Sequence, residues 1–128
     1  MPTIPCHILV DGNPIVIYAS RNGAPTKMLP ILTPFLERFW QEREFSSETD
    51  ETPDVLVAQL IVRFGFEFSE DDFSNLKAGL GFDPRAEYIY KIEGDRTVSI
   101  YIPQDSYRED PSQGLQGCRR LEEQLAHG

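Results

Sequence analysis

The chain has 128 residues, a formal net charge of −9 and two cysteines, Cys6 and Cys118. This length predicts one domain that buries roughly two-thirds of its unfolded surface without disulfides or metals. One cysteine falls in a predicted strand and the other in a predicted tail, which argues against a disulfide framework and for a reducing compartment. No apolar run approaches the ~18 residues of a membrane span, and no basic-then-apolar leader begins at Met1. We therefore expect a cytoplasmic protein, and its acidic charge argues against nucleic acid as a partner.

The acidic charge is concentrated in the middle of the chain. Residues 41–72 carry ten acidic and two basic side chains, whereas residues 73–103 carry four of each. Charge blocks of this kind are usually solvated surface. The alternative is an acidic surface that docks a partner protein.

Residues 6–20, CHILVDGNPIVIYAS, predict a β-hairpin. The Asp-Gly-Asn-Pro cluster is typical of a turn, and we place a two-residue loop at Gly12 and Asn13. This register gives one wholly apolar face, on which three pairs lie: Val10 with Ile15, Ile8 with Ile17, and Cys6 with Ala19.

Residues 87–103, EYIYKIEGDRTVSIYIP, predict a second hairpin, because apolar residues alternate on both arms. Paired residues share a face, so both apolar sets share one face only if Ile92 pairs with Val98. This pairing predicts a three-residue loop, 94–96, between Glu93 and Thr97. A two-residue turn would split the apolar sets across two faces.

Two helices are predicted between the hairpins. The first has Thr33 as its N-cap and Pro34 at its first position, where proline is tolerated, after a looser turn from Met28 to Leu32. Its apolar residues keep helical spacing: Ile31, Leu32, Phe35, Leu36, Phe39 and Trp40.

The second helix is predicted from Pro53 to about Arg63, because Thr52-Pro53-Asp54 is a good helix opening. The following residues are apolar almost all round, and residues 62–68 alternate strictly. A strand over 53–68 therefore remains the alternative.

Residues 75–82 alternate as in a strand, so the predicted order of elements is ββααβββ. We expect an α+β domain over residues 1–103, with a mostly antiparallel sheet of about five strands and two helices packed on one face. Residues 104–128 are polar and predict a tail, with a short helix over 115–126 as the alternative.

No segment carries a catalytic, cofactor or metal motif. His7 and Cys6 are adjacent in a strand and point to opposite faces, which makes a dyad geometrically poor. His127, as the penultimate residue, is expected to be too mobile for a catalytic base. The acidic residues 67–72 lack the spacing of a calcium loop, and Gly79-Leu80-Gly81 lacks the setting of a dinucleotide fingerprint. We expect no enzymatic activity, no cofactor and no metal.

The second face of the sheet is the most informative surface. If both helices cover the first face, the other face carries a set of apolar and aromatic side chains, which would mark an interface if the strands are neighbours. Scattered apolar surface residues are the plainer explanation. The candidate partner-binding residues are His7, Leu9, Val16, Tyr18, Ile89 and Tyr101.

These features predict a non-enzymatic protein-interaction module with an adaptor or regulatory role. We expect it to bind a protein partner and to form a homodimer through the sheet face. The alternative is a small-molecule sensor whose pocket lies between sheet and helices and is lined by Phe39, Trp40, Phe64 and Tyr90.

Overall fold

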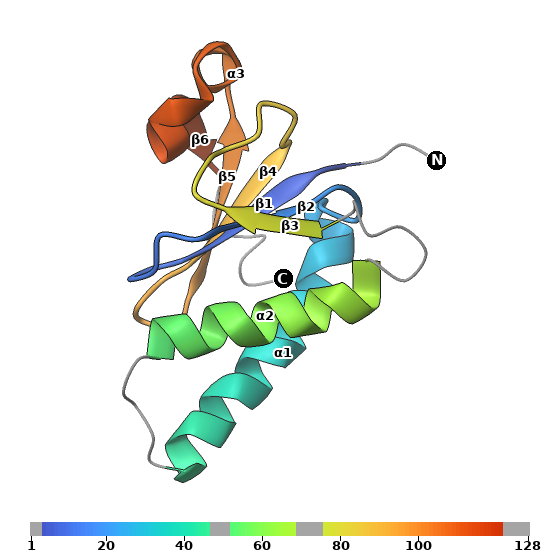
Figure 1. Ribbon diagram of the computed structural model, residues 1–128, viewed down its shortest axis with the longest axis vertical. Helices are drawn as coiled ribbons and strands as arrows, with labels where there is room; N and C mark the ends of the chain where they lie inside the picture. The colour runs from blue at the N-terminus through green and yellow to red at the C-terminus, as the bar shows by residue number, and fades with distance from the viewer. Residues whose placement is uncertain (1–3, 47–51, 69–75, 122–128) are drawn as a thin grey trace.

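The computed structural model describes residues 4–46, 52–68 and 76–121, which form an α+β domain with one six-stranded sheet. Helices α1 (Pro25–Ser46) and α2 (Thr52–Phe68) lie on one face of this sheet (Figure 1). The strand order is β3-β2-β1-β4-β5-β6, in which β1 and β4 are parallel and all other neighbours are antiparallel. The strands are β1 (Cys6–Val10), β2 (Val16–Ala19), β3 (Leu76–Gly79), β4 (Tyr88–Ile92), β5 (Val98–Pro103) and β6 (Cys118–Arg120).

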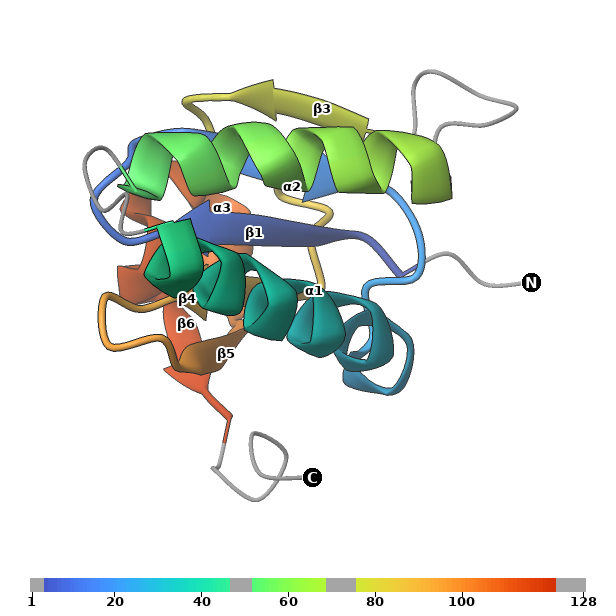
Figure 2. The same ribbon diagram turned by 90° about the horizontal axis from the view of Figure 1, so that it is seen from below.

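The predicted fold class and the order ββααβββ through β5 are confirmed. A sixth strand extends the sheet, and it follows two short elements, α3 (Asp105–Glu109) and the 3-10 helix η2 (Pro111–Gly117). The core lies between α1, α2 and the sheet (Figure 2). Its buried side chains include Ile8, Ile17 and Tyr90 from three neighbouring strands.

Both predicted hairpin registers are confirmed. In the first, Ile8 pairs with Ile17 and Cys6 with Ala19, but the predicted two-residue loop at Gly12 and Asn13 is wrong. Leu9 with Val16 is the last strand pair, and the N–H of Asn13 donates to the carbonyl of Val10 at 3.0 Å, which centres the turn on Asp11 and Gly12. In the second, Ile92 pairs with Val98, and the N–H of Glu93 donates to the carbonyl of Thr97 at 2.8 Å, which closes the three-residue loop. Arg96 in that loop has a φ of 73°, the left-handed conformation that such loops require at one position.

Helix α1 begins earlier than predicted, so the predicted N-cap at Thr33 is wrong. The N–H groups of Lys27 and Met28 both donate to the carbonyl of Ala24, and the helix continues through Pro30 and Pro34. An interior proline costs a helix about 3 kcal/mol. The helix persists because one stripe of its side chains is buried against the sheet on both sides of the prolines, namely Met28, Leu32, Leu36 and Phe39.

Residues 52–68 form a single helix, which decides the ambiguity of this segment. The helix predicted from Pro53 is confirmed and extends beyond Arg63 into residues whose alternation favoured a strand. Leu56, Leu60 and Phe64 are all buried at intervals of four residues. Burial of this helical stripe stabilises the helix more than the short alternation favours a strand.

The segment predicted as a polar tail contributes to the domain over residues 104–120. β6 pairs with β5, and η2 packs against α3, where Tyr107 is fully buried. Gly117 lies so close to Tyr107 that an added Cβ would sit 2.8 Å from its Cα. Residues 115–120 of the short helix that was considered belong to η2 and β6, and residues 122–126 lie outside the described residues.

Replacing Gly117 with Ala should destabilise the protein, because the new methyl group would lie 2.8 Å from the Cα of Tyr107 and would force η2 and α3 apart. We expect a loss of about 1–3 kcal/mol in the free energy of unfolding, measured by urea denaturation. Gly81→Ala is the matched control, since a Cβ there meets nothing within 4 Å. Equal stability of the two variants would contradict the close packing of η2 on α3.

Candidate functional site

The six residues predicted to bind a partner do lie together on the second face of the sheet. His7 pairs with Tyr18 on one side and with Ile89 on the other, while Leu9 pairs with Val16 and Ile89 with Tyr101. However, His7, Val16, Tyr18 and Ile89 are buried within the chain itself, and only Leu9 and Tyr101 are half-buried. The partner-binding role of this face stays a prediction, and its exposed part is smaller than the sequence suggested.

The loop between β3 and β4 supplies the cover over this face, together with residues of α3 and η2. The ring of Phe82 contacts the rings of His7 and Tyr107 edge-on, with centroids 5.4 and 6.3 Å away. Gly114 of η2 approaches the Phe82 ring closely and has a φ of 58°. The aromatic cluster of His7, Tyr18, Phe82 and Tyr107 therefore seals the face that the sequence left bare.

His7 joins the sheet to this cover through both ring nitrogens. The N–H of Asp83 donates to Nε2 at 2.8 Å, so Nε2 is an acceptor and Nδ1 carries the proton, which it donates to the carbonyl of Ile17 at 3.2 Å. Burial lowers the pKa of His7 below its ordinary value of 6.5, although these hydrogen bonds and the nearby Asp83 carboxylate oppose the shift. His7 is therefore neutral and fully hydrogen-bonded.

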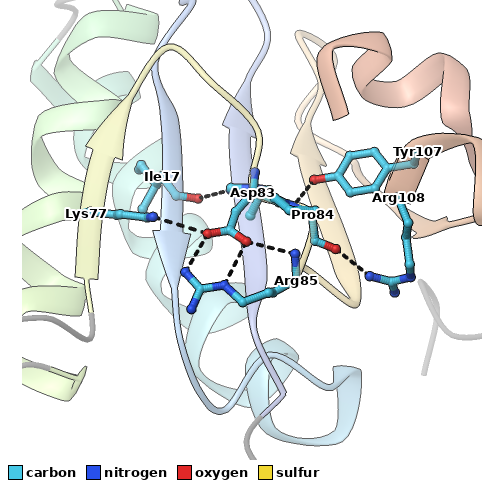
Figure 3. A network of polar contacts seen from close by, with 8 residues as sticks. Ile17, Lys77, Asp83, Pro84, Arg85, Tyr107 and Arg108 are labelled. Carbon is cyan, nitrogen blue, oxygen red and sulfur yellow. Dashed lines mark hydrogen bonds and ion pairs between the residues drawn. The ribbon is translucent and has the colours of Figure 1, made fainter. Parts of the chain in front are cut away.

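Asp83 is the centre of the polar network in Figure 3. Arg85 donates to both carboxylate oxygens, at 2.8 and 3.0 Å, and Lys77 of β3 donates to one of them at 3.2 Å. The Arg85 guanidinium holds the pKa of the Asp83 carboxyl well below its usual range. The carbonyl of Asp83 accepts a hydrogen bond from the Tyr107 hydroxyl at 2.6 Å, and Arg108 donates to the carbonyl of Pro84.

This network fastens the cover, and its chemistry is not that of a general base. Both nitrogens of His7 are engaged, and Cys6 points to the opposite face, where burial raises the pKa of its thiol to about 12. A thiol with this pKa stays protonated and is a poor nucleophile. Among the described residues, no group of three or more His, Cys, Asp or Glu side chains is placed to hold a metal ion.

A groove on the opposite side of the molecule is open to solvent. It lies between α1 and α2, has a volume of about 740 Å³, and is named the helix-face groove below. Three arginines and one acidic residue, Glu42, line it with Gln59 and Ser46; the arginines are Arg38, Arg43 and Arg63. Its apolar lining consists of Pro30, Ile31, Pro34, Phe35, Phe39, Val55 and Val62.

The helix-face groove was not predicted from the sequence, which placed the candidate binding surface on the second face of the sheet and the alternative pocket between sheet and helices. Val62 is 56% exposed and Phe45, at the end of α1, is 90% exposed, so both helices carry more apolar surface than the sheet can bury. Arg43 lies over the ring of Phe39 at 5.8 Å and donates to the hydroxyl of Thr52. The nearly all-round apolar pattern of α2 was the available signal for a second apolar contact surface.

The aromatic residues predicted to line a sensor pocket do not share one site. Phe64 and Tyr90 are buried in the core, and the Tyr90 hydroxyl donates to the carbonyl of Gly23. Phe39 lines the helix-face groove, and Trp40 lies beneath the guanidinium of Arg96. The sensor function remains an untested prediction.

The acidic docking surface predicted over residues 41–72 falls partly outside the described residues. Within the described part, Glu44 pairs with Arg96, and Asp54 accepts a hydrogen bond from Asn13 at 2.5 Å.

No helix among the residues that the structure describes has the length and apolar character needed to cross a membrane. Searches for related proteins found no matching family model, curated protein or solved structure.

Replacing His7 with Gln should remove a pH dependence of stability. The unfolded chain takes up a proton on His7 near pH 6.5, whereas the folded chain resists it because its pKa is lowered. The free energy of unfolding should therefore fall as the pH is lowered below about 6.5, by up to about 1.4 kcal/mol per pH unit, until the folded His7 titrates. Glutamine keeps a donor and an acceptor but does not titrate.

Urea denaturation of both proteins between pH 7.5 and 5 measures this difference in slope, with the value at high pH as each protein's own reference. His127 is present in both chains, so its contribution cancels. Parallel pH profiles for the two proteins would contradict the assignment of His7 as a buried neutral residue.

Proposed function

We propose that this protein is a non-enzymatic interaction module that binds an amphipathic helix of a partner protein in the helix-face groove. The observation that supports it is an exposed groove with an apolar floor and three arginines in a chain whose net charge is −9. Apolar patches rimmed by polar groups usually mark interaction sites on soluble proteins. The lining also includes arginine and phenylalanine, which are enriched at protein interfaces.

The charge of the groove favours an acidic partner. Among the described lining residues, Arg38, Arg43 and Arg63 outnumber Glu42, and both Arg43 and Arg63 already have partners within the chain. A helix bound in a groove presents apolar residues at i, i+3 or i+4, and i+7. Aspartate or glutamate beside those positions would pair with Arg38.

The fold supports binding by a preformed groove. Each helix buries one stripe against the sheet, so the groove walls are fixed by core residues such as Leu36 and Leu60. A preformed surface loses little conformational entropy when a ligand binds. The volume also lies within the ~300–1,000 Å³ of small-molecule sites, which keeps the sensor function as the alternative.

We also propose that the protein self-associates, works in a reducing compartment and has no nucleic-acid partner. Both cysteines are free, which fits a reducing compartment such as the cytoplasm. The net charge of −9 does not fit a phosphate backbone as ligand. The sheet face offers only Leu9 and Tyr101 for a homodimer, so self-association requires another surface.

A displayed library of peptides of about 12–15 residues, long enough to form a helix, tests the groove. It is selected against the intact chain and against Val62→Glu in parallel. The enriched peptides should combine helically spaced apolar residues with Asp or Glu. Their affinity should fall at least ~10-fold for Val62→Glu, because a carboxylate would be buried in an apolar site.

Gln41→Glu is the matched control, since it adds the same charge to an exposed α1 position outside the groove lining. It should bind the enriched peptides as the unchanged protein does, and Arg38→Glu should weaken the acidic ones. Val62 is more than half exposed, so its substitution should leave the thermal midpoint unchanged. Peptides that bind all variants equally would refute the groove as the binding site, and small-molecule screening against the same variants would follow.

A further inference from the structure

We infer that β3 is a self-pairing edge, through which two copies of this chain join antiparallel about a two-fold axis at Ala78. The inference rests on the self-association in the proposed function and names its surface. β3 is the outermost strand of the sheet, and β2 is its only neighbour among the described strands. Lys77, Ala78 and Gly79 are exposed, and Leu80 beyond them is 72% exposed.

An open strand edge is a template for pairing with another chain, and proteins usually block it with charge. Lys77 is the only charged residue of β3, and its contacts within its own chain keep its charge from blocking the edge. Its ammonium group contacts Asp83 at 3.2 Å and lies 4.6 Å from the centre of the Tyr18 ring, both within its own copy. The charge of Lys77 is thus balanced along the second face of the sheet.

The opposite edge of the sheet differs in this respect. β6 carries the exposed residues Arg119 and Arg120. Pairing of β6 with a second copy of itself would place like charges opposite or beside one another, which is destabilising. The two edges are therefore not equivalent, and β3 is the one suited to self-pairing.

The sequence of β3 also fixes a self-complementary register. With Ala78 opposite Ala78 of the second copy, Leu76 faces Leu80 and Lys77 faces Gly79. Leu76 and Ala78 pair with Ala19 and Ile17 of β2, so both lie on the face that carries the helices, whereas Leu80 follows the last residue of β3.

Lys77 would meet no obstacle in this register. Gly79 has no side chain, and even an added Cβ would contact nothing within 4 Å. A register centred on Lys77 would instead place two ammonium groups opposite each other, and one centred on Gly79 would leave Leu76 without an apolar partner.

The helix layer leaves this edge accessible. In Figure 2, β3 lies outside α2, at the margin of the molecule. The paired segment is short, so the interface lies below the ~1,200 Å² of standard stable complexes. We therefore expect a dimer that dissociates on dilution.

Cysteine cross-linking tests this register. Ala78→Cys is made in a Cys118→Ser background, so that the buried Cys6 is the only other thiol. Directly opposed residues of antiparallel strands have Cα atoms about 4.5–5.5 Å apart, within reach of a disulfide. Mild oxidation should therefore convert most of the protein to a covalent dimer, measured by non-reducing electrophoresis and light scattering.

Lys77→Cys in the same background is the matched control, because it is equally exposed on the same strand. Its two copies are offset by two residues along the strands, which places their Cα atoms beyond the ~7 Å limit for a disulfide. It should cross-link at least ~10-fold more slowly than the Ala78 variant. Equal cross-linking of both variants would overturn the register, since it would reflect random collisions.

Light scattering of the unchanged protein over a range of concentrations tests self-association separately from its location at the β3 edge. A dimer that forms without cross-linking of Ala78→Cys would overturn the β3 edge and leave self-association standing. A monomer at every concentration would refute both self-association and the β3 edge. Peptide binding in the helix-face groove does not depend on either result.

Discussion

The hydrogen bond from the N–H of Asp83 to Nε2 of His7 is the contact on which the topology depends. β3 lies at the sheet edge, whereas β4 lies on the far side of β2 and β1, so the connecting chain must cross the second face of both strands. A crossing chain carries polar backbone groups over an apolar surface, and each needs a partner there. His7 provides one such partner from within the sheet, and the Tyr107 hydroxyl provides another from the cover. The parallel pairing of β1 with β4 follows from this crossing.

In the helix layer, the burial of apolar side chains outweighs the poor helix propensity of α1. Pro30 and Pro34 each remove a backbone hydrogen bond from α1, yet the helix is continuous because its buried stripe spans both. The same prolines line the helix-face groove together with residues of α2. Their rigid rings add apolar surface with little side-chain entropy to lose on binding. The residues that weaken the helix locally therefore also shape its exposed face.

Local patterns were enough to predict the hairpins, because alternation and turn chemistry act over a few residues. The loop 94–96 followed from requiring Ile92 and Val98 to share a face, and the structure has this pairing. The membership of the second face was equally predictable, since it depends on parity along each strand. Its burial was not, because the contact between His7 and Asp83 joins residues 76 positions apart. The polar composition after Pro103 likewise concealed how fully Tyr107 is buried.

The candidate surfaces show a further limit of sequence patterns. The all-round apolar pattern of α2 signals a second contact surface, but the groove also depends on where α1 lies beside α2, which the sequence pattern does not give. The self-pairing register that we propose for β3 can be reasoned from sequence, since it depends on the order of residues 76–80. That β3 is an edge required the structure.

Asp83 links the cover over the second face to the edge strand β3. Its backbone N–H and carbonyl hold the cover over the second face, while its carboxylate holds Lys77 back along the sheet. The carboxylate stays ionised well below neutral pH, because Arg85 pairs with both of its oxygens. Loss of the cover would therefore also release the one charge that can protect the β3 edge. Asp83 therefore contributes both to the closure of the second face and to the position of the Lys77 charge.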